Sequence, residues 1–218
     1  MRTVGLLSSY REGGLAAAAV ASLRACCDTV LCLEGPAGAT LEAGEPTVFS
    51  RERRRPQDVL VREGAWASDA AKRTELVAWA KRLYPGPLWG VVLDGDEALL
   101  FPDLLPDYLD RADRQQAGPG GLRLKIVEPD GQVYESAARA LRIDLIADYV
   151  LSGYQIRLKG SQTVVTLPLL PAEKPPIIGE PHILHRSYLR PPERNERALR
   201  LGARELDELE ELKPAWLR

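Results

Sequence analysis

Residues 89–103, WGVVLDGDEALLFPD, combine a short apolar run with a group of acidic side chains. Val-Val-Leu at 91–93 is followed at once by Asp94, Asp96 and Glu97. An apolar run that ends in acidic residues is typical of a buried strand that reaches the protein surface. In open α/β sheets, ligands bind at the carboxyl ends of the strands. The stretch therefore predicts an α/β fold with a polar site at the end of this strand.

The acidic turn itself has two interpretations. Asp94 and Asp96 flank Gly95, which permits a tight turn in which both carboxylates converge. Carboxylate oxygens are the ligands that Mg²⁺ and Mn²⁺ prefer, and these ions usually share their shell with substrate phosphates. Alternatively, the acidic residues begin a helix, whose first turn negative charge stabilises, and Glu97 suits that role equally. The turn alone does not decide between them.

Composition places the chain among ordinary globular proteins. It has 218 residues, of which 45% are hydrophobic and 28% charged, and this length suits one large domain or two small ones. A net charge of −2 provides no general field for nucleic acid or anionic membranes. Three closely spaced cysteines are odd in number and fit no zinc signature, so we expect a reduced, cytoplasmic setting. No signal peptide or membrane span is expected.

Strand and helix patterns alternate over residues 1–112, the first half of the chain. Strands are predicted at 3–7 and 29–33, with an alanine-rich helix at 15–26 between them, which makes a βαβ unit. The intervening loop has neither GxGxxG nor GxxxxGK[ST] spacing, so a dinucleotide fold and a P-loop are not supported. The remaining elements predicted in this half are a strand at 46–49, a helix at 68–84 with Ser68 as N-cap, and short helical turns at 99–109.

Residues 113–218 have a different sequence pattern, which is rich in predicted β-strands. A Gly/Pro linker at 115–121 precedes a hairpin around Pro129-Asp130-Gly131. Strands are predicted at 122–127, 132–134, 138–143, 154–158 and 163–167, followed by an extended proline-rich segment at 168–181, an irregular loop carrying His182 and His185, and a charged helix at 192–212. We expect the two halves to share one sheet in a single domain.

This order of features resembles a family-2-type glycosyltransferase of the GT-A fold. The matching segments are VGLLSSYREGG (4–14), VLCLEGP (30–36), SDAAKRTELVAWAKRL (68–83), LDGDEALLFPDLL (93–105) and ILHRSYLRPPERN (183–195). The resemblance implies a mixed, mostly parallel sheet flanked by helices. It also implies that residues 1–112 bind the nucleotide-sugar and residues 113–218 form the acceptor side. One departure is Glu34-Gly-Pro at the end of the second strand, where the family more often has an Asp-rich turn.

The resemblance implies transfer of a sugar from a nucleotide-diphosphate donor to an acceptor. A divalent metal, Mn²⁺ or Mg²⁺, would act as Lewis acid on the leaving diphosphate. The implied metal ligands are Asp94 and Asp96, with His185 and His182 near the C-terminus. Asp94 and Asp96 are therefore the catalytic candidates, and Asp148 is a candidate general base for an inverting reaction. Asp144 and Asp148 are equally consistent with ordinary helix positions.

Several polar residues are candidates for binding the donor. They are Ser8, Tyr10, Arg11, Glu34, Lys72, Arg73, Asp94, Gly95 and Arg190. Lys72 and Arg73 have the alternative of a solvated helix face, and Tyr10 and Arg11 that of a structural loop. Arg186, Arg190 and Arg194 are predicted either to clamp phosphates or to solvate the tail.

The same residues leave other functions open. A nucleotidyltransferase or a metal-dependent phosphohydrolase would use the same carboxylates, although the chain has no Gly-rich phosphate loop after its first strand. A non-catalytic nucleotide-sugar-binding module is the third alternative. The acceptor is a small molecule, a protein or a nucleic-acid hydroxyl, and the Arg51–Arg55 cluster keeps nucleic acid among the candidates.

Overall fold

A computed structural model describes most of the first 186 residues. The described ranges are 2–10, 14–37, 57–115, 118, 122–150, 154–167 and 169–186. The predicted strand at 46–49, the Arg51–Arg55 cluster and the predicted helix at 192–212 lie outside them. Within the described ranges, no helix has the length and apolar character needed to cross a bilayer.

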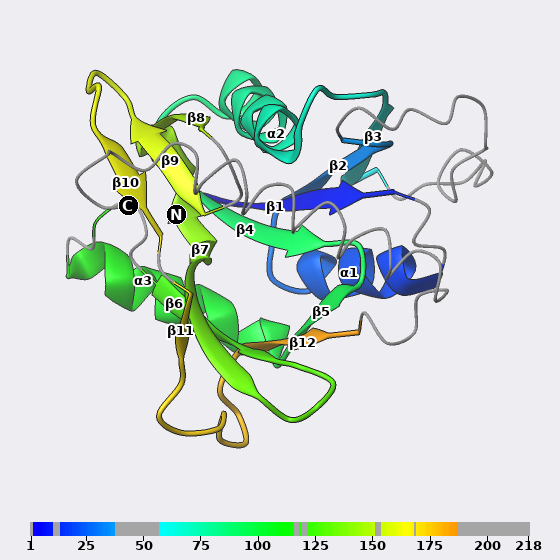
Figure 1. The fold of residues 1–218 in the computed structure, drawn as a ribbon, viewed down its shortest axis with the longest axis vertical. Coiled ribbons are helices and arrows are strands. Elements are labelled where there is room, and N and C mark those ends of the chain that lie inside the picture. Colours follow the sequence, from blue (N-terminus) through cyan, green and yellow to red (C-terminus); the bar gives the residue numbers. More distant parts are fainter. Residues whose placement is uncertain are drawn as a thin grey trace, which may run out of the picture.

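Four parallel strands form one side of the main sheet. They are β1 (Arg2–Ser9), β2 (Thr29–Glu34), β3 (Val59–Glu63) and β4 (Leu88–Asp94), in the spatial order β3-β2-β1-β4 (Figure 1). The strands predicted at 3–7, 29–33 and 91–93 are thereby confirmed. The nearly continuous apolar sequences of β2 and β4 reflect burial on both faces, as expected for parallel strands covered by helices.

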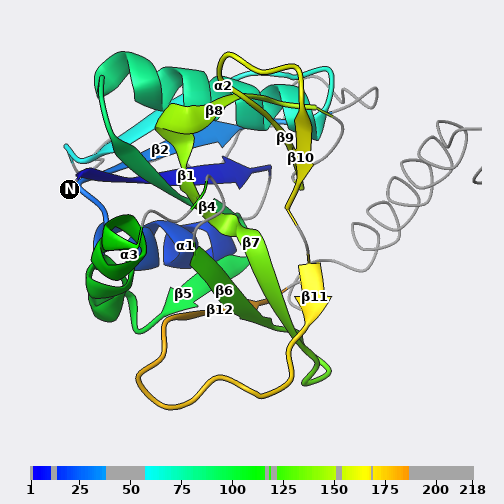
Figure 2. The ribbon, with the colours of Figure 1, turned by 90° about the vertical axis from the view of Figure 1, so that its left-hand side faces the viewer.

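Helices cover both faces of this parallel sheet. In both views, α1 (Gly14–Arg24) and α2 (Asp69–Leu83) lie on opposite sides of β1 and β4 (Figures 1 and 2). Each helix packs into its own core cluster, one around Leu23 and the other around Leu76. The predicted N-cap of α2 is confirmed, because the Ser68 Oγ accepts a hydrogen bond from the Ala71 N–H at 3.1 Å.

The second half of the chain extends the same sheet. β7 (Val133–Arg142) pairs antiparallel with β4, and β6 (Leu122–Val127), β12 (His182–His185) and β5 (Glu97–Leu100) follow in that order. β11 (Leu169–Pro171) also pairs with β7. Between β5 and β6 the chain forms the 3₁₀ turn η2 (Pro102–Leu104) and α3 (Leu105–Arg114). The expected mixed α/β architecture with helices flanking the sheet is confirmed.

A small second sheet packs beside α2. It consists of β8 (Ile146–Tyr149), β9 (Gln155–Leu158) and β10 (Val164–Thr166), and it follows the 3₁₀ turn η3 (Ile143–Leu145). Thr74 of α2 receives a hydrogen bond from the Tyr149 N–H at 2.9 Å. Asp148 therefore lies on a strand, and the alternative that it is a helix residue is wrong.

Three further predictions need correction. The short helical turns predicted at 99–109 begin only at residue 102, because residues 99 and 100 belong to strand β5. The strands predicted at 132–134 and 138–143 are one continuous strand, β7, because β6 and β11 pair with its first part and β4 and β6 with its last part. The segment of His182 and His185 was predicted to be an irregular loop, but it is strand β12. Ile183 is fully buried between β5 and β6, so pairing with both neighbours stabilises this short strand.

Candidate functional site

The order of the parallel strands defines where a ligand is expected. From β1 the chain moves outward to β2 and β3, and α2 then returns it to β4 on the other side of β1. Such a reversal of strand order is the position at which open α/β sheets bind ligands, beyond the carboxyl ends of the strands. Ser8 and Asp94 are register partners at this end of β1 and β4, and Ser9 is the partner of Glu34 on β2.

Asp94 lies between two buried arginines. Its Oδ1 accepts a hydrogen bond from Arg73 Nη2 at 2.7 Å, and its Oδ2 accepts one from Arg139 Nη2 at 3.2 Å. Arg73 Nε also donates to Asp69 Oδ2 at 2.6 Å. Burial alone would raise the pKa of Asp94, but the charges of Arg73 and Arg139 hold it well below its usual range. Asp94 is therefore ionised, and its side chain remains 29% exposed.

Arg139 joins the two ends of the acidic turn. Its Nη2 donates to Glu97 Oε1 at 2.6 Å, while Glu97 Oε2 accepts from the Asp94 N–H at 2.8 Å. Burial raises the pKa of Glu97 to about 7, against the opposing charge of Arg139. Arg139 is not among the site residues predicted from the sequence. The available signal was a single charged residue within the otherwise small and apolar run at 137–141, because a buried arginine needs a carboxylate partner.

Asp96 belongs to a second cluster with His185 and Glu128. His185 Nε2 lies 2.9 Å from Asp96 Oδ2, and its Nδ1 lies 2.7 Å from Glu128 Oε2. Burial would lower the pKa of His185, but hydrogen bonding and charge from Asp96, together with hydrogen bonding from Glu128, raise it to about 9. The Asp96 side chain is fully buried, whereas that of His185 is 26% exposed, so the pair reaches the surface only through His185.

Asp96 and His185 are the described residues that could hold a divalent cation, but the metal would have to displace the proton that their ion pair keeps on His185. A metal-ligating histidine usually donates its other ring N–H to a carboxylate, which fixes the ring. Glu128 occupies that position on Nδ1, so Nε2 faces the Asp96 carboxylate, itself a metal-ligand group. Within the described ranges, no group of three or more His, Cys, Asp or Glu residues is placed to hold a metal. Such a two-ligand site would depend on substrate phosphates to complete the shell.

The other two predicted metal ligands are placed differently. Asp94 faces the arginines described above. His182 and His185 are three residues apart on a strand, so their side chains point to opposite faces. The His182 Nδ1 lies 2.7 Å from the Glu180 carbonyl oxygen, and its ring packs at 5.9 Å from the ring of Phe101.

The buried side chain of Lys72 links the carboxyl ends of β1 and β2. Its Nζ donates to the carbonyl oxygens of Ser9 and Gly35, both at 2.8 Å, and it lies 5.1 Å from the centre of the Trp66 ring. Burial lowers the pKa of Lys72 to about 8, while the carboxylate of Glu34 acts in the opposite direction. Lys72 and Arg73 are 2% and 8% exposed, so a solvated helix face is excluded for both.

Arg186 forms hydrogen bonds with both the acidic turn and the start of α1. Its N–H donates to the Asp96 carbonyl at 2.9 Å, and its Nη2 donates to the carbonyl oxygens of Leu15 and Glu97 at 2.8 and 3.1 Å.

The other predicted site residues are more widely spread. Asp148 lies on β8 of the small sheet, where its Oδ2 is 3.6 Å from Arg157 Nη1. Tyr10 follows β1 directly, and Gly95 lies in the turn between β4 and β5. The remaining predicted site residues, Arg11, Arg190 and Arg194, lie outside the described ranges.

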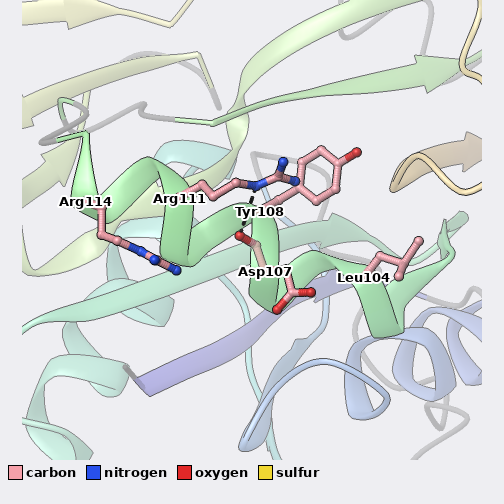
Figure 3. Close-up of a pocket in the computed structure, with 5 residues that line it drawn as sticks. All are labelled: Leu104, Asp107, Tyr108, Arg111 and Arg114. Atoms are coloured by element: carbon pink, nitrogen blue, oxygen red, sulfur yellow. Dashed lines mark hydrogen bonds between the residues drawn. The ribbon is translucent and has the colours of Figure 1, made fainter.

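A pocket of about 430 Å³ lies on α3, away from this site (Figure 3). Its described lining residues are Leu104, Asp107, Tyr108, Arg111 and Arg114. The Arg111 guanidinium stacks over the Tyr108 ring at 4.2 Å. Asp113 of the same helix pairs with Arg142, which lies opposite Trp89 near the start of β4. The pocket is therefore at the end of the sheet opposite Asp94.

The sequence matches no family model and no curated protein. Among solved structures the chain is similar to TarS of S. aureus. TarS 1-349 in complex with UDP-GlcNAc matches at 9% identity and a TM-score of 0.38, over 59% of this chain and 34% of that one. TarS 1-349 in complex with UDP matches at 10% identity and a TM-score of 0.36, over 59% and 35%. A third TarS structure has a TM-score of 0.35 at 11% identity, over 59% and 21%.

The chain thus spans about a third or less of the length of these TarS chains. TM-scores this low do not establish a common fold.

Proposed function

We propose that this chain transfers a sugar from a nucleotide-diphosphate donor to an acceptor, with a GT-A-like arrangement of its site. One observation carries the proposal: the acidic turn after β4 places Asp94 beside Ser8 of β1 at the point where the strand order reverses. The partly exposed Asp94 carboxylate is suited to accept a hydrogen bond from a donor hydroxyl. Glu34, at the end of β2, is the corresponding candidate for contacting the base or ribose.

The charges around the site indicate whether the protein alone can neutralise the diphosphate of the donor. Asp69 and Asp94 balance the two positive charges of Arg73 and Arg139. Glu97, whose pKa burial raises to about 7, adds part of a negative charge at neutral pH. Cleaving the sugar–phosphate bond places negative charge on the leaving diphosphate, which must be neutralised. The arginines are already compensated by their partners, so an additional cation is needed. This balance supports a divalent metal at Asp96 and His185 as part of the proposal.

Within this proposal each described residue has a defined task. Asp96 and His185 would hold the metal, and Glu128 would orient the His185 ring. When bound, Mn²⁺ or Mg²⁺ would supply positive charge to the diphosphate. Arg73 and Arg139 fix Asp94, and Lys72 fixes the ends of β1 and β2. Asp148 stays the candidate base, and a cytoplasmic location stays a prediction.

Thermal unfolding with nucleotide diphosphates tests donor binding directly. UDP, GDP, CDP and dTDP are each added with Mn²⁺ and with EDTA. A ligand at a hundred times its Kd stabilises the folded state by about 2.7 kcal/mol. We expect one of the four to raise the Tm, and to raise it further with Mn²⁺. The proposal is wrong if none of them changes the Tm under either condition.

Two variants separate the contribution of the metal to the Tm increase from that of the nucleotide. Asp96→Asn should remove the Mn²⁺-dependent part of the Tm increase, since it weakens one of the two proposed ligands. Asp107→Asn, an exposed carboxylate on α3, is the matched control and should behave as wild type. Release of nucleotide diphosphate from a panel of nucleotide sugars, with small-molecule, peptide and oligonucleotide acceptors, then identifies donor and acceptor classes.

A further inference from the structure

Two adjacent cysteines face each other at the end of α1. The Sγ atoms of Cys26 and Cys27 are 3.7 Å apart. Successive side chains on a continuing helix point about 100° apart, because a turn holds about 3.6 residues. Here the helix ends at Arg24, and the N–H groups of both cysteines bond to the Leu23 carbonyl at 3.1 and 2.9 Å. This closing turn brings the two sulfurs to the same side.

The pair lies at the opposite end of β1 from the proposed donor site. Asp28, the next residue, accepts a hydrogen bond from the Thr3 N–H and donates its own N–H to the Thr3 carbonyl. Thr3 is near the start of β1, whereas Ser8 is near its end. Whatever binds at the cysteines therefore does not belong to the nucleotide-sugar site.

The separation of the sulfurs suits a bridging atom. A disulfide would require a distance of about 2.05 Å, so the sulfurs would have to approach each other considerably. The observed 3.7 Å is the separation of two thiols in direct contact. One atom bonded to both sulfurs needs a much smaller approach than a disulfide does. The pair is thus preorganised to chelate one thiophilic atom.

The number of ligands that the protein offers indicates which class of thiophilic atom the pair can bind. Zinc takes four ligands, and in the described part of the chain no third His, Cys, Asp or Glu joins these two sulfurs in a metal-binding group. A trivalent arsenic that already carries one carbon substituent is complete with two sulfurs. We propose that Cys26 and Cys27 form a dithiol site for monosubstituted trivalent arsenic compounds.

The reaction is balanced without an oxidant. An arylarsenoxide, R–As=O, reacts with two S–H groups to form two As–S bonds and one water, and arsenic stays trivalent. The hydrogen bond with Cys26, followed by burial, raises the pKa of Cys27 well above its usual value. The two S–H protons leave with the arsenic-bound oxygen as the water molecule. Cys27 is the more exposed of the two and is the point of entry.

Phenylarsine oxide is the probe, added to the reduced full-length chain and followed by intact mass. The wild type should bind one arylarsenic group that survives excess 2-mercaptoethanol and is removed by 2,3-dimercaptopropanol. Because closing the second bond is intramolecular, Cys26→Ser and Cys27→Ser should each bind on the order of 100-fold more weakly. Cys32→Ser, at a buried cysteine on β2, is the matched control and should retain the adduct.

Peptide mapping of the wild type decides the case even if a variant fails to fold. Cleavage on the amino side of Asp28 separates the Cys26–Cys27 pair from Cys32. The adduct should appear on the peptide that ends at Cys27. Three results would overturn the proposal. They are an adduct on Cys32, removal of the adduct by 2-mercaptoethanol, and full retention of the adduct in a folded Cys26→Ser or Cys27→Ser variant.

Discussion

Arg139 is the residue on which the charge balance of the acidic turn depends. It is 5% exposed and contacts both Asp94 and Glu97. Removing one member of a buried ion pair leaves an uncompensated charge, which typically costs 3–5 kcal/mol. We therefore expect Arg139→Met to lower the free energy of unfolding by about 3 kcal/mol, as measured by urea denaturation with circular dichroism.

The double variant Arg139→Met/Glu97→Gln tests this explanation. Removing both members leaves no buried charge without a partner at this position, and Asp94 retains Arg73. We expect the double variant to be more stable than Arg139→Met alone. Equal or lower stability of the double variant would show that Arg139 acts through packing instead of charge.

A second residue-scale prediction concerns Glu128. If it orients His185 for a metal, Glu128→Gln should weaken Mn²⁺ binding about 10–100-fold, the usual effect of losing an outer carboxylate. Mn²⁺ is titrated calorimetrically in the presence of the nucleotide diphosphate that raises the Tm. Asp130→Asn, on the same hairpin, is the control and should bind Mn²⁺ as wild type does. Unchanged Mn²⁺ affinity in Glu128→Gln would remove Glu128 from the site.

These residues also mark how far the sequence could predict the site. The spacing of Asp94, Gly95 and Asp96 after an apolar run placed an acidic turn at the end of a strand, which the structure bears out. Arg139 escaped prediction because its role depends on β7 pairing with β4, a contact between distant segments of the chain. Glu128 reaches His185 only through the parallel pairing of β6 with β12, which no local pattern indicates.

At the scale of elements, α2 is the best predicted part because its signals are local. Its start follows from Ser68 and its end from Pro85-Gly86-Pro87. β12 is the opposite case: its four residues become a strand only because β5 and β6 pair with it on either side. The sheet that this strand completes is therefore visible only in three dimensions.

The cap of α2 provides the prediction at this scale. Ser68→Ala removes the hydrogen-bond acceptor of the Ala71 N–H, so the free energy of unfolding should fall by about 1 kcal/mol in urea denaturation. Ser68→Asp keeps an acceptor at the same position and adds negative charge near the helix start, so it should retain the wild-type stability. A loss of stability in Ser68→Asp equal to that in Ser68→Ala would contradict the capping role.

For the whole molecule, the reversal of strand order between β1 and β4 explains why the candidate site draws on both halves of the chain. β1, β2 and β4 supply Ser8, Glu34 and Asp94 at one end of the sheet. The later strands β7 and β12 add Arg139 and His185 to the acidic turn. The alternating pattern predicted the parallel strands, but the antiparallel return of β7 beside β4 determines the partners of Asp94.

The opposite end of the sheet depends on Asp144, which connects the two halves. Its Oδ1 accepts hydrogen bonds from the Leu88 N–H at the start of β4 and from Arg142 Nε at the end of β7, at 3.2 and 3.0 Å. Arg142 also pairs with Asp113 of α3 at 2.6 Å. Burial would raise the pKa of Asp144, but the hydrogen bonds from Arg142 and the Leu88 N–H lower it.

A carboxyl group whose pKa is lower in the folded than in the unfolded state stabilises the protein above its unfolded pKa of about 3.9, and this stabilisation is lost as the pH falls. We therefore expect Asp144→Asn to lower the free energy of unfolding at pH 7 by about 1–2 kcal/mol. The difference from wild type should shrink toward pH 3, as measured by urea denaturation at both pH values. Glu173→Gln, at an exposed carboxylate outside the helices, is the control and should match wild type at both. A difference for Asp144→Asn that stays constant from pH 7 to pH 3 would mean that the charge of Asp144 does not hold the two halves together.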